Sequence, residues 1–468
     1  MKIPHVFVFL FLIIVACSAL SYVIPSGAFE REGRLVGGTE QRVVIPGTYQ
    51  PISKHYSIKG LLLDEEVGGR ASPTSLQDIL TSVPKGLNQS ATLIFFVFIT
   101  GAVLNLIIET KAIHAFLVKT KARFAKSPTA LFFILYLTLS VLSSFFGIGI
   151  GLIPLVPVVL LLAKQYGYNR MFGSGLILLP LWIGWATATT NPFTVHIAQQ
   201  LAELPIGSGL ALRFVVFVLG VGIGYWYLMR YGKSNKDNEN LTARKNDVTS
   251  ELDDFDSVIM TRRHVGILVT FVLGYVAIFS LGWSFVEMGG GLIGLIIVIT
   301  FVGGLTTEKS MLYVVRGLEV MIVPALVIGV ARGVSVVMQE SLITDTMLFH
   351  ASNSLSGLPK SIAAVGMLLF QSLLNFFIPS ASGQALVSMP LMTPLADLLG
   401  ISRQTAVLAF VFGDGFTNLI IPTNGVLMAM LGIAGVPFDK WFRFALPVFS
   451  FLLLLSIVAV LFAVWTEY

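Results

Sequence analysis

Long apolar runs alternate with short polar connections along most of the chain. A helix needs roughly 17–25 residues to cross about 30 Å of hydrocarbon, so apolar runs of this length predict transmembrane helices. We predict such helices at 4–24, 91–108, 129–146, 171–190, 209–229, 264–283, 289–306, 317–338, 361–378, 404–421 and 443–465. Two further apolar stretches, 147–165 and 379–398, are interrupted by Gly, Pro and Ser, and we do not expect them to be plain spans.

The composition agrees with this pattern. Hydrophobic residues make up 55% of the 468 residues and charged residues only 12%, whereas soluble globular proteins carry about 25% charged residues. A surface with so few charges must face lipid, which excludes a soluble enzyme, a disordered chain and a nucleic-acid-binding protein. A single cysteine, Cys17, excludes a disulfide framework. The predicted class is an all-α polytopic membrane protein in a lipid bilayer.

The first apolar run resembles a signal peptide, and the residues before Cys17 resemble a lipoprotein cleavage site. The run stays apolar through Ile24, which is long enough to span, and many further spans follow. We therefore predict an uncleaved first helix with a cytoplasmic N-terminus.

Basic residues predict the orientation of the other spans, because cytoplasmic loops are enriched in Lys and Arg. Segment 109–127 carries five basic residues and is predicted to be cytoplasmic. The long polar tract 231–263 is predicted to be a cytoplasmic linker between two halves. Residues 25–85 would then lie outside, and the alternation around 41–45 indicates a small β-hairpin there.

The sequence repeats at an offset of 231 residues. This offset aligns Lys85-Gly86-Leu87 with Arg316-Gly317-Leu318, Glu109 with Glu340, Pro128 with Pro359, and Phe145-Phe146 with Phe376-Phe377. Segment 340–358, the partner of 109–127, contains no basic residue, so the two copies are predicted to cross the membrane in opposite directions. Such inverted repeats are typical of secondary transporters, whose substrate site lies at the repeat interface near the midplane.

Each copy contains two interruptions at matching places. Discontinuous helices expose free backbone N–H and C=O groups, and transporters build their sites from them. We predict re-entrant hairpin tips at 147–151 and 380–384, and unwound helix breaks at 187–192 and 417–424.

Ser, Thr and Asn side chains gather at these interruptions. Their neutral oxygens suit Na⁺, while the N-termini of half-helices favour a carboxylate. The candidate substrate-binding residues are Thr189, Thr190, Asn191, Ser380, Ser382, Gly383, Gln384, Asp414, Thr417, Asn418, Thr423 and Asn424. Gly149, Thr187, Ser380 and Asn418 are candidate Na⁺ ligands. Na⁺ or H⁺ is the expected coupling ion, and no other cofactor is expected.

Asp414 is the strongest single candidate, because an ionisable residue inside a span is energetically costly and is therefore a candidate functional residue. It could bind Na⁺, carry a proton, pair with a substrate ammonium, or act as a structural cap. On the sequence, the site contains no buried Lys or Arg, which favours a substrate with an ammonium or guanidinium group. For the remaining candidates we expect structural roles: Glu109 and Glu340 at span ends, His196 hydrogen-bonded in the core, Trp182 and Trp185 in packing, and Arg170 and Arg403 as interfacial anchors.

Three motifs resemble the C4-dicarboxylate anaerobic carrier (DcuC-like) family, specifically its YfcC branch. They are Tyr22-Val23-Ile24-Pro25-Ser26-Gly27-Ala28-Phe29-Glu30-Arg31, Pro379-Ser380-Ala381-Ser382-Gly383-Gln384, and Gly413-Asp414-Gly415-Phe416-Thr417-Asn418 with Pro422-Thr423-Asn424. The resemblance implies an ion-coupled elevator carrier, usually a homodimer, in the bacterial inner membrane. In such carriers a scaffold holds a mobile transport part with two hairpins and two broken helices. The first tip departs from the Ser-Asn-Thr tips of sodium–dicarboxylate relatives, which argues against symmetric sodium sites.

This resemblance implies a division of the chain into scaffold and transport parts. The scaffold parts would be 1–142 and 264–373, the transport parts 143–205 and 374–440, and the connecting segments 206–230, 231–263 and 441–468.

Secondary-active transport of a small polar metabolite is therefore the predicted function. No catalytic spacing lies on a span, which argues against an enzyme. No Walker sequence is present, so we expect any pumping to draw on an ion gradient. A channel is a less favoured alternative. The resemblance favours an amino acid such as arginine or ornithine as the substrate. The alternative is a Na⁺- or H⁺-coupled carrier of C4-dicarboxylates or short-chain carboxylates.

Overall fold

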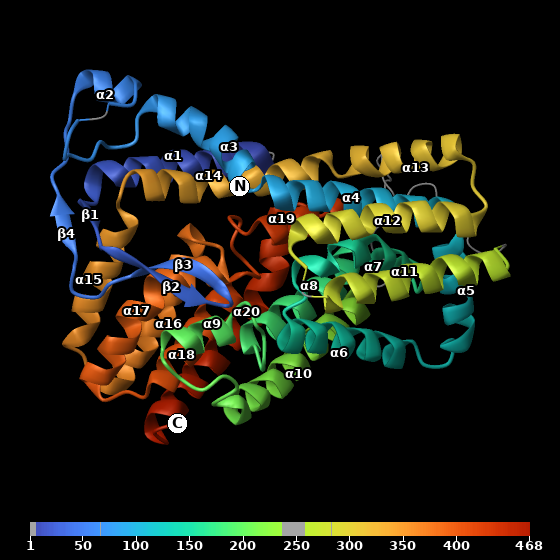
Figure 1. Cartoon of the computed structure of the whole chain (residues 1–468). Coiled ribbons are helices and arrows are strands. Elements are labelled where there is room, and N and C mark those ends of the chain that lie inside the picture. Colours follow the sequence, from blue (N-terminus) through green and yellow to red (C-terminus); the bar gives the residue numbers. More distant parts are fainter. Residues whose placement is uncertain (1–5, 66, 236–257, 282) are drawn as a thin grey trace.

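The computed structural model describes residues 6–65, 67–235, 258–281 and 283–468, and most of them are helical (Figure 1). Every predicted span overlaps a helix, and eight helices in the described ranges are long and apolar enough to cross a membrane. The all-α polytopic class is thus confirmed. Most of the predicted linker 231–263 lies outside the described residues.

Two series of helices follow one another in the same order, on either side of α11 (Arg262–Ser280) and α12 (Phe285–Gly303). The first series comprises α3 (Leu76–Gln89), α4 (Ala91–Glu109), α5 (Ala112–Arg123), α6 (Pro128–Phe146), η1 (Ile150–Leu155), α7 (Val156–Gln165), α8 (Arg170–Thr187), α9 (Val195–Leu201) and α10 (Leu210–Ser234). The second comprises α13 (Thr307–Val320), α14 (Ile322–Glu340), α15 (Thr344–Ser356), α16 (Lys360–Phe377), α17 (Ala381–Leu399), α18 (Arg403–Thr417), α19 (Gly425–Ala434) and α20 (Phe438–Trp465). The internal repeat is therefore also a structural repeat.

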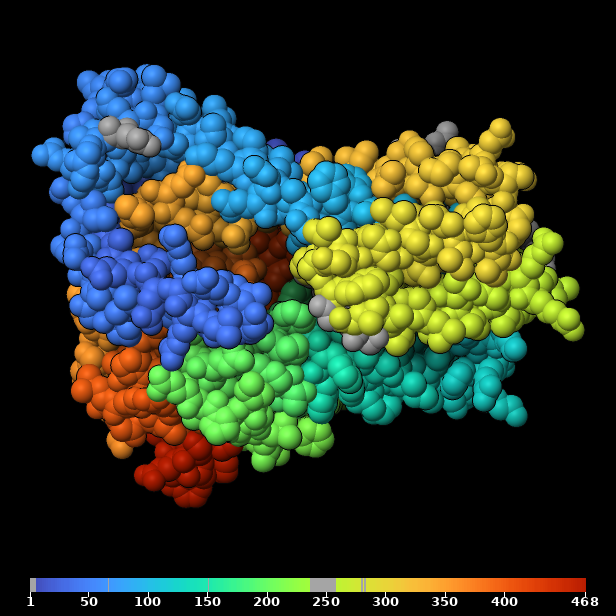
Figure 2. Space-filling view, in the orientation of Figure 1, coloured from blue at the N-terminus to red at the C-terminus, as the bar shows by residue number. Residues whose placement is uncertain are grey.

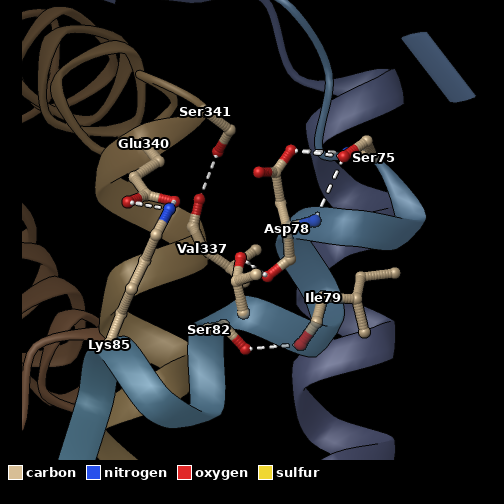
Figure 3. Close-up of polar contacts among 9 residues, drawn as sticks. Ser75, Asp78, Ile79, Ser82, Lys85, Val337, Glu340 and Ser341 are labelled. Carbon is tan, nitrogen blue, oxygen red and sulfur yellow. Dashed lines mark hydrogen bonds and ion pairs between the residues drawn. The ribbon is translucent and has the colours of Figure 1, made fainter. Parts of the chain in front are cut away.

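The two copies pack against each other in a crossed manner, α3 on α14 and α4 on α13. Lys85 pairs with Glu340 at 2.7 Å (Figure 3), and Arg316 pairs with Glu109 at 3.4 Å. These four residues are the repeat partners identified in the sequence, so the two ion pairs are equivalent. Both are partly exposed, and each is worth about 1 kcal/mol at most.

The crossed helices run antiparallel. Leu87 lies against Gly329 while the earlier Ser82 lies against Gly333, and Asn105 donates to the Tyr313 carbonyl 2.7 Å away. The repeat-related Gly86 and Gly317 allow this approach: a Cβ at either would lie 2.4 Å from a backbone oxygen of the opposing helix. Small residues bring transmembrane backbones into contact in this way. Figure 1 shows that α4 continues in the direction of α3, and α14 in the direction of α13. The equivalent helices α3 and α13, and likewise α4 and α14, therefore run in opposite directions, and the repeat is inverted.

A segment with β-structure precedes the first copy, after α1 (Val6–Val23). β1 (Ser26–Ala28) pairs with β4 (Gln50–Ile52), and β2 (Arg31–Val36) pairs with β3 (Thr39–Val44), both antiparallel; a short α2 (Ile58–Leu62) follows. The predicted small hairpin is confirmed as β2–β3.

The β2–β3 hairpin bridges distant parts of the chain. At its base Arg31 pairs with Asp345 of α15 at 2.8 Å. Val36, next to its turn, and Val43, near its base, are buried in a cluster with residues of α9, α17 and α18. Figure 2 shows the surface hollowed between this hairpin and α12, with red at the floor where Figure 1 places α19.

Arg403, the first residue of α18, lies beside the C-terminal ends of α17 and α9. It pairs with Asp397 at 2.8 Å and with Glu203 at 3.0 Å, and Arg34 of the hairpin reaches Glu203 at 3.3 Å. The hydrogen bonds from Arg403 and Arg34 lower the pKa of Glu203. The predicted anchoring role of Arg403 agrees with these contacts.

Candidate functional site

Both predicted helix breaks are present and have equivalent backbones. α8 ends at Thr187 and α9 begins at Val195, while α18 ends at Thr417 and α19 begins at Gly425. At an offset of 230 residues, Thr187 aligns with Thr417 and Pro192 with Pro422. Proline lacks an N–H and cannot continue the helical hydrogen-bond pattern, so it fits an unwound segment.

The hairpin turns also form, but the second lies slightly earlier than predicted. α6 ends before Gly147, whose φ of 66° favours glycine, and the chain turns back through η1. In the second copy the turn occupies 378–380, and Ser380 caps α17 by accepting from the Gly383 N–H. Ser382, Gly383 and Gln384 therefore belong to the first turn of α17 rather than to the tip. The α17 N-terminus forms here because Ser is a favoured N-cap residue.

At the first break, the polar groups bind the end of α6. Ser144 Oγ lies 3.3 Å from Thr187 Oγ1 and 3.1 Å from Thr189 Oγ1, and it accepts from the Thr189 N–H. Thr190 donates to the Phe145 carbonyl at 2.9 Å, and Asn191 donates to the Ser143 carbonyl at 3.4 Å. The candidate residues of this break thus already have partners within the chain.

At the second break, Asn375 of α16 is the central donor. Its amide lies 2.7 Å from the Asp414 carbonyl, 2.7 Å from Thr417 Oγ1 and 3.1 Å from Asn418 Oδ1. Asn424 also donates to Asn418 Oδ1 at 2.6 Å and caps α19 through the Leu427 N–H. Four polar side chains are therefore fixed around one unwound segment.

Asp414 is almost completely buried at this break, with an exposed fraction of 1%. The Trp185 indole is a polar neighbour of its carboxylate, but neither carboxylate oxygen accepts a hydrogen bond from a described residue. Gly184 occupies the equivalent position of the first copy at the offset of 230. An unpaired buried carboxylate costs several kcal/mol, and binding a proton or a cation would relieve that cost.

More polar atoms without partners lie on the neighbouring helices. Gln384 donates to Gln371 Oε1 at 2.7 Å, joining α17 to α16, and Gln371 lies against Gly413, next to Asp414. Gln371 Nε2, Gln384 Oε1 and the Thr423 hydroxyl have no partner among the described residues. This concentration of unused polar atoms makes the second break the stronger candidate for ligand binding.

Among the described residues, the candidate Na⁺ ligands are not joined into one cluster by hydrogen bonds. Thr187 donates to the carbonyls of its own helix, and Gly149 lies against the Trp185 ring. Ser380 caps α17, and Asn418 accepts from Asn375 and Asn424. The two breaks therefore keep separate polar networks.

One sequence expectation about charge was wrong. Arg213, the fourth residue of α10, is fully buried and donates to the carbonyls of Thr189 at 3.3 Å and Ser208 at 2.9 Å. A buried arginine therefore does lie at the first break. The sequence alignment paired Arg213 with Arg443, which is exposed, and gave no signal of this difference.

Other candidates follow the expected structural roles only in part. Trp182 and Trp185 pack edge to face, 6.2 Å apart, but Trp185 also borders Asp414. His196 is partly exposed, and its Nε2 has no hydrogen-bond partner in the part of the chain that the structure describes, so the expectation of a hydrogen-bonded core histidine is wrong.

The comparison with protein families identifies the chain. The C4-dicarboxylate anaerobic carrier (DcuC) family matches residues 3–465. The chain belongs to this family. It is a membrane transporter, since the family is one of carriers and the described residues include eight helices fit to span a bilayer.

Two carrier relatives align over almost the whole chain. One is an uncharacterized protein of Haemophilus influenzae, 28% identical over 97% of this chain and 95% of its own. The other, from Escherichia coli, is named "Putative basic amino acid antiporter YfcC"; it is 28% identical over 98% of this chain and 96% of its own.

Two solved transporter structures are distantly similar to this carrier. YdaH of Alcanivorax borkumensis is 16% identical, with a TM-score of 0.45 and 99% of both chains covered. MtrF of Neisseria gonorrhoeae is 16% identical, with a TM-score of 0.43 and 99% and 95% covered.

Asn375 was not among the residues predicted from the sequence of this carrier, although the internal repeat contains a signal for it. The offset of 231 aligns Asn375 with Ser144, and both precede a Phe-Phe pair. Each of the two side chains organises the break of its own copy. Polar residues at equivalent positions of both hairpin arms would have identified them.

Proposed function

We propose that this carrier works by an elevator mechanism in which the hairpins and broken helices move together. Support comes from packing: Gly184 and Gly413 bring α8 and α18 against the backbones of α6 and α16. A moving part would then include all of α6 and α16, which shifts the proposed boundaries from 143 and 374 toward 128 and 360. The remaining scaffold would contain α3, α4, α13 and α14 with α11 and α12.

The proposed substrate is an amino acid with a cationic side chain, such as arginine or ornithine, carried by exchange. The observation that supports it most is the buried Asp414 carboxylate at the second break, to which no side chain or backbone group in the described ranges donates a hydrogen bond. The printed name of the Escherichia coli relative points to the same substrate class. Asn375, Thr417, Asn418 and Asn424 would hold the break open around the ligand.

A second candidate function is Na⁺- or H⁺-coupled transport of C4-dicarboxylates or short-chain carboxylates. The family description favours it, and so does Arg213 at the first break. In that case Asp414 would bind the coupling ion instead of the substrate.

Counterflow in proteoliposomes tests the proposal. Vesicles loaded with unlabelled arginine should accumulate labelled arginine or ornithine transiently, and loading with succinate should not drive this uptake. Saturable counterflow of succinate alone would establish the second candidate. Flux that neither saturates nor shows counterflow would indicate a channel.

We further propose a bacterial inner-membrane protein with a cytoplasmic N-terminus and a homodimeric assembly. The five basic residues of 109–127, now seen in and around α5, support the orientation. Cysteines introduced at Lys121 and Ser352 should react with an impermeant thiol reagent from opposite sides of the membrane. Reaction from the same side would refute the proposed orientation, and native mass spectrometry would test the dimer.

A further inference from the structure

Arg213 is a buried cation that the proposed function has not used. Its exposed fraction is 0%, and Nε and one terminal nitrogen, Nη1, have no hydrogen-bond partner among the described residues. The other terminal nitrogen donates to two backbone carbonyls, those of Thr189 and Ser208. Among the described residues, no carboxylate forms an ion pair with this guanidinium.

A guanidinium cannot relieve burial by losing its proton, because arginine stays charged in proteins. A buried charge is tolerated when an opposite charge or enough hydrogen bonds satisfy it. Two carbonyls satisfy only part of the donor set of Arg213. The remaining donors match an acceptor with negative charge, and carboxylates fit the arginine fork best.

The second copy shows that capping the break does not require this charge. At the offset of 230, Thr189 aligns with Leu419. The Leu419 carbonyl accepts from the indole of Trp441 on α20 at 2.8 Å, as the Thr189 carbonyl accepts from Arg213 on α10. A neutral donor therefore serves the same backbone position, and the charge of Arg213 is surplus to that role.

Arg213 and Asp414, which carry opposite charges, therefore lie near the same segment of chain, residues 186–189. The Thr189 carbonyl contacts Arg213, and Ala186, three residues earlier, lies against Gly415, the neighbour of Asp414. A solute bound along this segment would meet a cation from the first copy and an anion from the second. An amino acid carries the complementary pair of charges.

We propose that Arg213 binds the carboxylate of the transported solute, while Asp414 faces its cationic group. The inference rests on the proposed function and sharpens it, because it makes a free carboxylate a requirement for recognition. A site built to pair with a charged group discriminates strongly against an analogue that lacks it.

Arginine and agmatine test this requirement, since agmatine is arginine without its carboxylate. In thermal-shift titrations of the wild-type protein, arginine should bind at least about tenfold more tightly than agmatine. Equal binding of the two compounds would overturn the proposal, and this measurement does not depend on any variant folding.

Variants then locate the effect at Arg213. Arg213→Gln should raise the KM for arginine at least tenfold and leave agmatine binding unchanged, and Arg213→Lys should recover part of the loss. Arg443→Gln is the matched control, because Arg443 is the exposed repeat partner, and it should behave as the wild type. An equal loss of arginine and agmatine binding in Arg213→Gln would reduce Arg213 to a structural cap.

A succinate titration separates the failure of this inference from the failure of the proposed function. If the wild type binds succinate but neither arginine nor agmatine, the amino-acid assignment is wrong. A loss of succinate binding in Arg213→Gln would then still support Arg213 as the carboxylate ligand. Retained succinate binding in that variant would refute both the amino-acid assignment and the role of Arg213 as the carboxylate ligand.

Discussion

The two helix breaks share a backbone plan but differ in charge and in how well their polar groups are paired. At the first, Ser144, Thr187 and Thr189 bind one another, and the added charge is a cation, Arg213. At the second, Asn375 organises the segment, and the added charge is an anion, Asp414. In the other copy, Gly184 occupies the position equivalent to Asp414, and Trp441 donates to the carbonyl equivalent to the one that Arg213 contacts.

The comparison separates the features that keep the helices unwound from the side chains that are available to a ligand. The shared features, which are the terminal threonines, the prolines and the capped carbonyls, keep both helices unwound. The features that differ are single side chains, and they place uncompensated charge at the breaks. An inverted repeat can thus supply two similar helix breaks, while a few substitutions make the combined site asymmetric.

Asn375→Leu should have the largest effect on the molecule. It removes an amide whose two N–H groups face three buried acceptors, of which Asn418 Oδ1 keeps Asn424 as a donor, so we expect a loss of about 2–3 kcal/mol of stability. Transport should fall with it, because Thr417 and Asn418 lose their fixed positions. Chemical denaturation in detergent measures the change. Ser372→Ala is the control on the same helix, since Ser372 binds only its own helix, and a similar loss there would contradict the special role of Asn375.

Asp414→Asn should reduce transport at least tenfold, which corresponds to about 1.4 kcal/mol. The amide keeps the shape but removes the charge that binds a substrate cation or the coupling ion. Folding should change little, because an intramembrane charge is costly to bury. Initial rates of counterflow measure the effect.

Asp64→Asn, at an exposed position outside the spans, is the control for Asp414→Asn. If Asp414→Asn transports at the wild-type rate with the same ion dependence, Asp414 is a structural cap. The second break would then lose the buried charge that distinguishes it as a ligand site.

Much of the fold was predictable, because hydrophobic length and sparse residues carry strong signals. The spans follow from apolar runs. The ion pairs of Lys85 with Glu340 and Arg316 with Glu109 follow a symmetry already visible at the offset of 231. The breaks were predictable because Gly, Pro and Asn seldom interrupt a span without reason.

Side-chain burial at the site was less predictable. Arg213 and Arg443 align in the sequence, yet one is buried and the other exposed, because local packing decides which donor reaches the break. The second hairpin tip was misplaced by a few residues, since a Ser-Gly stretch fits both a turn and the first turn of a capped helix.

Ser144→Ala should have a smaller effect than Asn375→Leu. It leaves the Thr189 N–H without its side-chain acceptor and should cost about 1 kcal/mol, measured by denaturation as above. Transport should change less than about twofold, because the hydroxyls of Ser144, Thr187 and Thr189 contact one another. A tenfold loss of transport with normal stability would instead place the hydroxyls of this break in the binding site.

Trp441→Phe should have the smallest effect on transport of the series. The phenyl ring can pack beside Phe444, but the N–H to the Leu419 carbonyl and part of a fully buried indole are lost. A carbonyl without one partner is tolerated better than an orphaned N–H, and the small cavity adds to the cost, so we expect a loss of about 1–2 kcal/mol of stability. Trp226→Phe, which changes a half-exposed indole, should cost less. If Trp441→Phe alters substrate preference at unchanged stability, the indole contacts the ligand. Trp441 and Arg213 would then not be equivalent donors to the carbonyls of the two breaks. In that case Trp441 would no longer show that a neutral donor can replace Arg213 at this carbonyl.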